Sequence, residues 1–263
     1  MSLISFKLSN KPADKEQPFG HERIEYILSM AVAFIILVIA SGIMIVIIGG
    51  MKKFFDLFYI GEGETTGRTL TIVDHAASGD GGATLEQAGS GIWTMAAPFA
   101  VERTSPTTVT LRGEDAAAQA VYSAVLCDGE KSVVSLVKSG TGTWTLTGAN
   151  SYSGTTTLSG GRLSLATAGR LGTGEVVFAD GELSLEDTLA EKSVAFDQVV
   201  LQEGENILRI GKGIAAALSS LTRTEGTLDV VLGKGSSFKC ADVADTAPEW
   251  LTVNGQAARF SSD

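Results

Sequence analysis

Few side chains in this chain of 263 residues have the types and spacing that catalysis needs. His75 follows Asp74, and a hydrolase could use such a pair as a base and its orienting carboxylate. No Gly-x-Ser-x-Gly turn accompanies the pair to present a nucleophilic serine. We therefore expect His75 to be an ordinary surface residue and the chain not to be an enzyme.

Carboxylates and glycine-rich loops offer three other kinds of chemistry. A glycoside hydrolase needs two carboxylates in one groove, but Glu182, Glu186 and Asp187 are dispersed enough to be ordinary surface charge. Residues 78–82 contain a single Asp-Gly-Gly, whereas a calcium-binding β-roll needs tandem copies of its motif. No loop has the spacing of a phosphate-binding P-loop. We expect no cofactor.

A short phrase of the form Gly-x-apolar-x-apolar recurs at intervals of about 20 residues. It is present five times, once with Asn in place of Gly: Gly142-Thr-Trp144-Thr-Leu146, Gly161-Arg-Leu163-Ser-Leu165, Gly181-Glu-Leu183-Ser-Leu185, Asn206-Ile-Leu208-Arg-Ile210 and Gly226-Thr-Leu228-Asp-Val230. Upstream, residues 85–95 match residues 136–146 at an offset of 51. These phrases predict an internal repeat.

Each part of the phrase has a physical reason. Glycine supplies the positive φ of a sharp corner, and the alternation that follows places two apolar side chains on one face of a strand. A unit of 20 residues cannot close a core alone, so it must stack on its neighbours with strands about 4.8 Å apart. We expect one interior column of Trp144, Leu163, Leu183, Leu208 and Leu228, and a second of Leu146, Leu165, Leu185, Ile210 and Val230.

Residues 137–185 carry a family resemblance. They resemble the autotransporter-associated β-strand repeat, also called the passenger-associated transport repeat, strongly over about 50 residues and in degenerate form over roughly 130 more. The matching residues are Gly140, Gly142, Trp144, Leu146, Gly148, Asn150, Tyr152, Gly154, Thr155, Gly160, Gly161 and Leu163. The resemblance implies a right-handed parallel β-helix that serves as a stalk or display surface, and it brings no catalytic residues.

An apolar segment precedes the repeats. Residues 27–48 carry no charge and would extend about 33 Å as a helix, enough for a hydrocarbon core of about 30 Å. The sequence predicts a transmembrane helix over 27–50, because the run is too long for a signal peptide and no small-x-small cleavage site follows cleanly. Basic residues are slightly more numerous before the segment than after it, which favours a cytoplasmic N-terminus and an extracytoplasmic C-terminal domain.

The first 45 residues resemble a second family, the cation diffusion facilitator transporters. The matching residues are Lys11, Pro12, Ala13, Asp14, Pro18, Phe19, Gly20, His21, Glu22, Arg23, Glu25 and Tyr26. In that family the loop can hold zinc through an Asp and two His, which correspond here to Asp14, Gln17 and His21. Asp14 and His21 are therefore candidate metal ligands, although an amide in the middle position weakens the site.

Four regions follow from these observations: a polar N-terminal loop (1–26), the transmembrane helix (27–50), a juxtamembrane collar and linker (51–68) and the β-solenoid (69–263). Residues 113–124 are expected to form a loop or short helix, 214–221 a strand, and 250–260 the end of the stack. Cys127 and Cys240 lie about five coils apart, too far for a disulfide.

The net charge of −10 excludes nucleic acid as a partner, since phosphate binding requires a basic face. The main hypothesis is a non-enzymatic, membrane-anchored, extracytoplasmic β-solenoid, a stalk or adhesin-like passenger module whose loops bind cell-surface or extracellular ligands. Its alternative is a fragment of a zinc efflux transporter fused to an unrelated β-repeat tail. A carbohydrate-processing enzyme on a β-helix is the third hypothesis.

Overall fold

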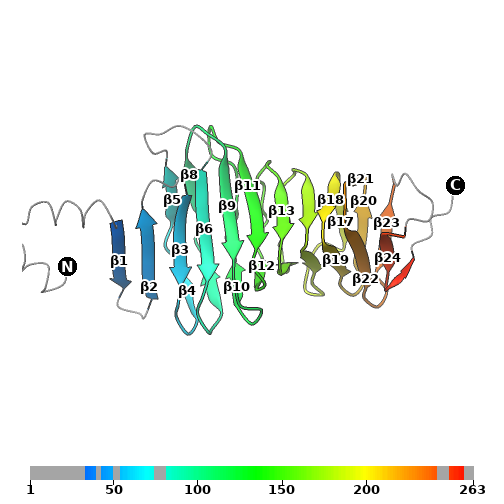
Figure 1. Ribbon diagram of the computed structural model, residues 1–263, viewed down its shortest axis with the longest axis horizontal. Coiled ribbons are helices and arrows are strands. Elements are labelled where there is room, and N and C mark those ends of the chain that lie inside the picture. Colours follow the sequence, from blue (N-terminus) through cyan, green and yellow to red (C-terminus); the bar gives the residue numbers. More distant parts are fainter. Residues whose placement is uncertain (1–32, 40–42, 50–53, 74–80, 242–248, 258–263) are drawn as a thin grey trace, which may run out of the picture.

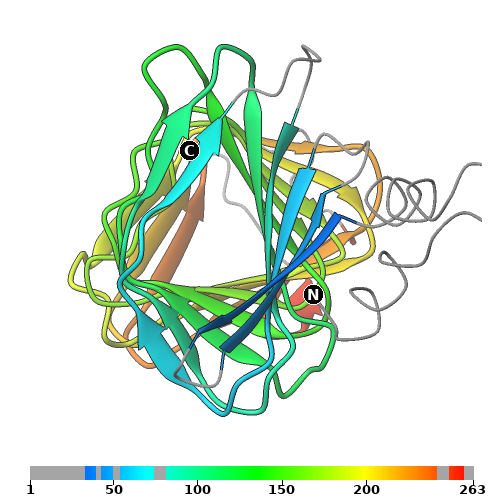
Figure 2. The ribbon, with the colours of Figure 1, turned by 90° about the vertical axis from the view of Figure 1, so that its left-hand side faces the viewer.

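The computed structural model describes residues 33–39, 43–49, 54–73, 81–241 and 249–257, with side-chain surroundings from Leu57 onward. Successive turns of the chain lie side by side along one long axis (Figure 1). Viewed along that axis, the strands outline a three-sided cross-section (Figure 2). The described residues therefore form the predicted mainly-β parallel solenoid, while its right-handed winding stays a prediction.

Two long sheets form two sides of the solenoid, and every pairing between coils in them is parallel. Sheet I contains β3 (Phe54–Tyr59), β6 (Gly81–Gln87), β9 (Thr107–Arg112), β11 (Val134–Ser139), β13 (Thr156–Ser159), β15 (Val176–Ala179), β18 (Val199–Glu203) and β21 (Leu221–Arg223). Sheet II contains β4 (Glu64–Thr66), β7 (Trp93–Met95), β10 (Gln119–Tyr122), β12 (Thr143–Leu146), β14 (Arg162–Leu165), β16 (Glu182–Leu185), β19 (Glu205–Ile210), β22 (Thr227–Leu232), β24 (Leu251–Val253) and the antiparallel β25 (Gln256–Ala257).

The third side has strands only near its two ends. They are β5 (Leu70–Val73), paired with β8 (Phe99–Glu102), and the ladder of β17 (Ser193–Phe196), β20 (Ala215–Leu218) and β23 (Ser237–Cys240). Between them the chain runs without strands, and one isolated bridge joins Ala149 to Arg170. Backbone hydrogen bonds such as Ser151 N–H to the Leu126 carbonyl (2.9 Å) and Thr173 N–H to the Tyr152 carbonyl (2.9 Å) also link neighbouring coils on this side. Backbone groups without such a bond need side-chain partners.

One continuous hydrophobic cluster fills the interior from Leu57 to Leu251. Strand residues alternate between this interior and the surface, as in β12, where Trp144 and Leu146 are buried and the two threonines are half-buried. Leu163, Leu183 and Leu228 all belong to the cluster, which confirms the expected single pile of inward side chains. Cooperative burial along the axis follows, because no coil has a core of its own.

The predicted transmembrane helix over 27–50 is not found where the structure describes this segment. Residues 33–39 and 43–49 instead form an antiparallel hairpin, β1 (Ala33–Ile39) and β2 (Ile43–Gly49). A continuous apolar run does not distinguish a strand pair from a helix by periodicity, and β-branched residues favour the strands. Among the described residues, no helix is long and apolar enough to span a membrane.

The solenoid also begins earlier than predicted. β3 pairs in parallel with β6 and β4 with β7, inside the 51–68 segment that was assigned to a collar and linker. Leu57 and Tyr59 point into the core. The aromatic run forms a strand that pairs with the next coil, and alternate residues of a strand face the same side. Residues 119–122 form strand β10 within the predicted 113–124 loop.

At the other end, the strand expected within 214–221 is confirmed as β20. The antiparallel pair of β24 and β25 ends sheet II, which confirms the predicted closure within 250–260 for its described part. An antiparallel turn at the last coil occupies backbone groups that would otherwise be open to edge association.

Candidate functional site

The predicted interior columns are present over four coils. Trp144, Leu163, Leu183 and Leu208 stack in register, and Leu146, Leu165, Leu185 and Ile210 form the second column. The prediction is wrong for the fifth coil, where Leu228 stacks on Asn206, and Val230 on Leu208. Leu228 is still buried, because a shift of two residues keeps a strand residue on the same face.

The glycine of the phrase has two different roles. Gly161 and Gly226 have φ of 56° and 80°, as predicted. Gly142 and Gly181 do not have positive φ. A Cβ at Gly142 would lie 2.9 Å from the Ala118 carbonyl oxygen, so this position is restricted by the close approach of the neighbouring coil.

The 51-residue offset also has a structural basis. Trp93 and Trp144 lie two coils apart in one column, with Ala120 between them. Their rings meet edge to face with centroids 5.7 Å apart, and Tyr59 stacks on Trp93 at 5.1 Å. The small Ala120 side chain leaves the volume that the two indoles fill.

Asn150 holds the middle coils together on the side that lacks strands. Its Oδ1 accepts a hydrogen bond from the Leu126 N–H (2.7 Å) in the coil before, and its Nδ2 donates to the Arg170 carbonyl (2.8 Å) in the coil after. Tyr152, also fully buried, bonds Thr156 at 2.7 Å. Burial raises the pKa of Tyr152 to about 12. These two residues of the repeat motif are therefore structural.

Lys138 is a buried charged residue that the sequence reasoning did not single out. It is fully buried in the interior column of sheet I, between Leu111 and Leu158. Its Nζ donates to the carbonyls of Ser139 (2.8 Å), Gly140 (2.9 Å) and Gly160 (3.0 Å). Burial lowers the pKa of Lys138 to about 8, while the charge of Glu114 opposes the shift. The alternation Val134, Leu136, Lys138 was the signal that placed it inside.

In other coils too, buried polar side chains form hydrogen bonds with backbone groups near the corner between sheet I and sheet II. Gln87 donates through Nε2 to the Gly91 and Gln119 carbonyls. Asn206 accepts from the Asp180 and Gly181 N–H groups and donates to the Glu203 and Thr227 carbonyls. A corner interrupts the strand ladder, so its backbone groups need such partners. The two long sheets are thus joined by a series of internal polar contacts.

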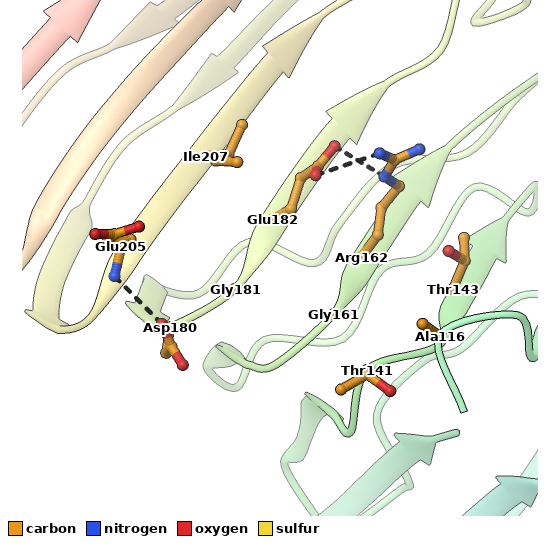
Figure 3. Close-up of a pocket in the computed structure, with 10 residues that line it drawn as sticks. All are labelled: Ala116, Thr141, Thr143, Gly161, Arg162, Asp180, Gly181, Glu182, Glu205 and Ile207. Atoms are coloured by element: carbon orange, nitrogen blue, oxygen red, sulfur yellow. Dashed lines mark hydrogen bonds and ion pairs between the residues drawn. The ribbon is translucent and has the colours of Figure 1, made fainter. Parts of the chain in front are cut away.

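An open depression lies on the outer face of sheet II, with a volume of about 410 Å³. Figure 3 shows its lining residues: Ala116, Thr141, Thr143, Gly161, Arg162, Asp180, Gly181, Glu182, Glu205 and Ile207. Glu182 lies between Arg162 (Nε to Oε1, 2.8 Å) and Arg209 (Nε to Oε1, 2.9 Å), so three successive coils are bridged by ion pairs. This triad was not predicted from the sequence.

The carboxylates considered for carbohydrate chemistry are engaged with protein groups. Glu186 Oε1 accepts from Ser164 (2.9 Å) and Ser184 (2.8 Å), and Asp187 Oδ1 accepts from the Lys212 N–H (2.6 Å). These bonds fix neighbouring coils relative to one another, because Ser164 and Glu186 belong to successive coils.

The candidate metal ligands Asp14 and His21 lie outside the described residues, as does His75. Among the residues that are described, no three His, Cys, Asp or Glu side chains are placed to hold a metal ion. Cys127 is exposed, Cys240 is half-buried, and neither forms a disulfide, as predicted from their separation.

Comparison with known proteins identifies one segment. A family model described as passenger-associated-transport-repeat matches residues 136–165, from β11 to the end of β14. The match confirms the repeat resemblance for this segment, and the resemblance of residues 1–45 to cation diffusion facilitators finds no support. No curated protein and no solved structure gives a significant match to the chain.

Proposed function

We propose that this chain is a non-enzymatic, extracytoplasmic passenger-like module whose rigid solenoid acts as a stalk and adhesin-like display surface. The observation that carries the proposal is the transport-repeat match over 136–165, which spans one complete parallel coil and part of the next in a continuous stack. A solenoid held by one long core resists bending, and its corners and loops are free to vary. Extracellular ligands would bind to those loops.

The absence of enzymatic activity is part of the same proposal. Glu182 is paired with two arginines and Glu186 with two serines, so both carboxylates serve contacts between coils. A general acid or base needs a lone pair or proton that is available to a substrate. The surface of sheet II therefore suits display better than catalysis.

Membrane anchoring through residues 27–50 is the third part of the proposal. The segment is uncharged and apolar, whatever conformation it adopts in a bilayer, and β2 lies next to the first coil at β3. We propose that it attaches the N-terminal end of the rod to the membrane. The C-terminal end would then point away from the bilayer.

The test is the location of the rod in intact cells that make the protein. An epitope inserted after Asp115, in the exposed corner that precedes β10, should bind antibody in intact cells and be removed by added protease. Alkaline extraction should leave the full chain with the membrane, whereas Ile36→Asp with Val46→Asp should release it. An epitope protected from antibody until the cells are lysed would contradict the proposal.

A further inference from the structure

Lys138 occupies the place in sheet I where the size of the coil changes. Leu57, Leu85, Leu111 and Lys138 stack one above the other, and they are 26 to 28 residues apart in sequence. After Lys138 the next two steps, to Leu158 and Phe178, are 20 residues each. The boundary between β11 and β13 therefore joins wide coils to narrow ones, and we call this boundary the seam.

An ammonium group at the seam is a weak point in an otherwise apolar column. Its inward neighbours in the stack are Leu111 and Leu158, and all three side chains are at most 1% exposed. In the part of the chain that the structure describes, Lys138 makes no ion pair, and its three acceptors are neutral carbonyls. A buried charge without a counter-charge opposes folding even when it is hydrogen-bonded.

The charged groups around the seam do not remove this cost. Glu114, in the corner loop after β9, is the carboxylate whose charge acts on Lys138, and it is largely exposed and pairs with Arg112 at 3.5 Å. Arg112 itself points outward, where it also pairs with Glu86. Since the strands that flank Lys138 in the column contribute leucines, its protonation state depends on burial more than on neighbours.

We propose that the seam between β11 and β13 is a proton-linked opening point of the rod, closed more tightly when Lys138 is neutral. In a stack where each coil contacts only its neighbours, the least favourable interface opens first. Protonation adds charge to this one interface and leaves the leucine columns on either side unchanged. The coils before and after the seam would then separate as two blocks.

The sign follows from linkage. The pKa of Lys138 is about 8 in the folded chain and 10.5 in the unfolded one, so the unfolded chain holds the proton longer as pH rises. Stability therefore increases from pH 8 toward 10.5. The ratio of folded to unfolded chain should gain about tenfold from this group between pH 7 and pH 9.

The experiment compares wild type with Lys138→Met, which removes the titrating group at similar volume, by urea unfolding of the full chain at pH 7 and pH 9. The ratio of the two unfolding constants should shift about tenfold in favour of the wild type at pH 9. Proteolysis at the corners 139–142 and 159–161, measured relative to the corner 203–206, should slow at pH 9 in the wild type and stay constant in Lys138→Met.

A direct titration keeps the proposal testable if Lys138→Met does not fold. The Cε resonance of Lys138 in the isotopically labelled wild type should move with a midpoint near pH 8. A midpoint at 10.5 or above would overturn the proposal, as would parallel pH dependence in both proteins or equal change of cleavage at all three corners.

Discussion

The wide coils before Lys138 and the narrow coils after it fill their interiors in different ways. In the wide coils, Tyr59 stacks on Trp93, and the Trp93 ring also meets Trp144 of the first narrow coil, with Ala120 as the small residue between the indoles. In the narrow coils, leucines such as Leu163 and Leu183 stack on identical neighbours. A larger cross-section needs larger side chains to reach interior packing density, so coil length and core composition change together.

The comparison shows that the repeat phrase determines which side chains face the interior and where the chain turns. The residues between the phrases determine how long each coil is. Phrases with Trp144 and with Leu183 occupy the same column although the coils that contain them differ in length. Part of the extra length lies in sheet I itself, where β6, β9 and β11 have 7, 6 and 6 residues and β13 and β15 have 4 each. The longer strands keep the register of the column. Solenoids tolerate insertions of this kind because each coil contacts only its neighbours.

The largest expected effect is a buried charge in the narrow coils. Leu183→Asp should destabilise the fold by more than about 4 kcal/mol, since the leucine column offers the carboxylate no partner. The matched control is Thr145→Asp, at a half-buried outward position of β12, which should cost little. Unchanged β-sheet circular dichroism and melting temperature in Leu183→Asp would contradict the interior column.

Removal of the Trp144 indole should act on the contact between the wide coils and the first narrow coil. Trp144→Ala should cost about 3–5 kcal/mol in urea unfolding, because it leaves a cavity and frees the Arg112 carbonyl. Ala120→Leu should cost about 1–3 kcal/mol by overfilling the space between the indoles. Leu163→Met, a change of nearly constant volume, should cost less than about 1.5 kcal/mol. Equal effects of Ala120→Leu and Leu163→Met would remove the packing difference between the two regions.

Loss of the amide that links coils on the strand-free side comes next. Asn150→Leu leaves the Leu126 N–H and the Arg170 carbonyl without partners, at about 1–3 kcal/mol for each buried group. Hydrogen exchange at the Leu126 amide should accelerate by the factor that corresponds to this loss of free energy. Protection of that amide in the variant at the wild-type level would show that the bond is unimportant.

Alkaline pH should weaken the coils on both sides of the seam through the buried tyrosines Tyr122 and Tyr152. Burial raises the pKa of Tyr152 to about 12, above its unfolded value of 10, so the stability it contributes is lost as pH rises from 10 to 12. The full loss is on the order of 3 kcal/mol for one such tyrosine. Tyr152→Phe should reduce this dependence in unfolding experiments, with Tyr122→Phe as a second case of the same shift. If the free energy of unfolding depended on pH in both variants as it does in the wild type, the raised pKa values of the two tyrosines would be contradicted.

The smallest effect is expected on the outer face. Glu182→Gln breaks two ion pairs with Arg162 and Arg209 at the surface, where each contributes about 1 kcal/mol or less. Its effect on stability should decrease further at high salt. A loss of more than about 3 kcal/mol would mean that the triad, and not the interior column, holds these coils together.

Much of the fold was predictable because its signal is local and repeated. The alternation in Trp144-x-Leu146 and its later copies fixed the strand type, the stacking and four coils of register. The fifth coil was missed because Asn206 was aligned with Gly226, whereas Asn206 is itself an inward residue of β19 and pairs with Leu228. Corner insertions shift a phrase without changing its appearance in the sequence.

The polar interior could not be read in the same way. Lys138 stands at an inward position, but only the structure places three corner carbonyls within its reach. The Arg162, Glu182 and Arg209 triad joins residues that are up to 47 positions apart, and their pairing depends on coil length. The apolar run at 33–49 was ambiguous between a helix and a hairpin, because a continuous run of apolar residues has no period that distinguishes the two.

Stacking of successive coils in parallel register is the claim on which the rest depends, and disulfide formation between neighbouring rungs tests it most directly. With Cys127 and Cys240 replaced by serine, Thr143→Cys with Arg162→Cys should oxidise to an intramolecular disulfide, because the two residues face each other on β12 and β14. Thr143→Cys with Glu182→Cys, two rungs apart at about 9.6 Å, should remain reduced. Oxidation of the second pair in place of the first would contradict the solenoid.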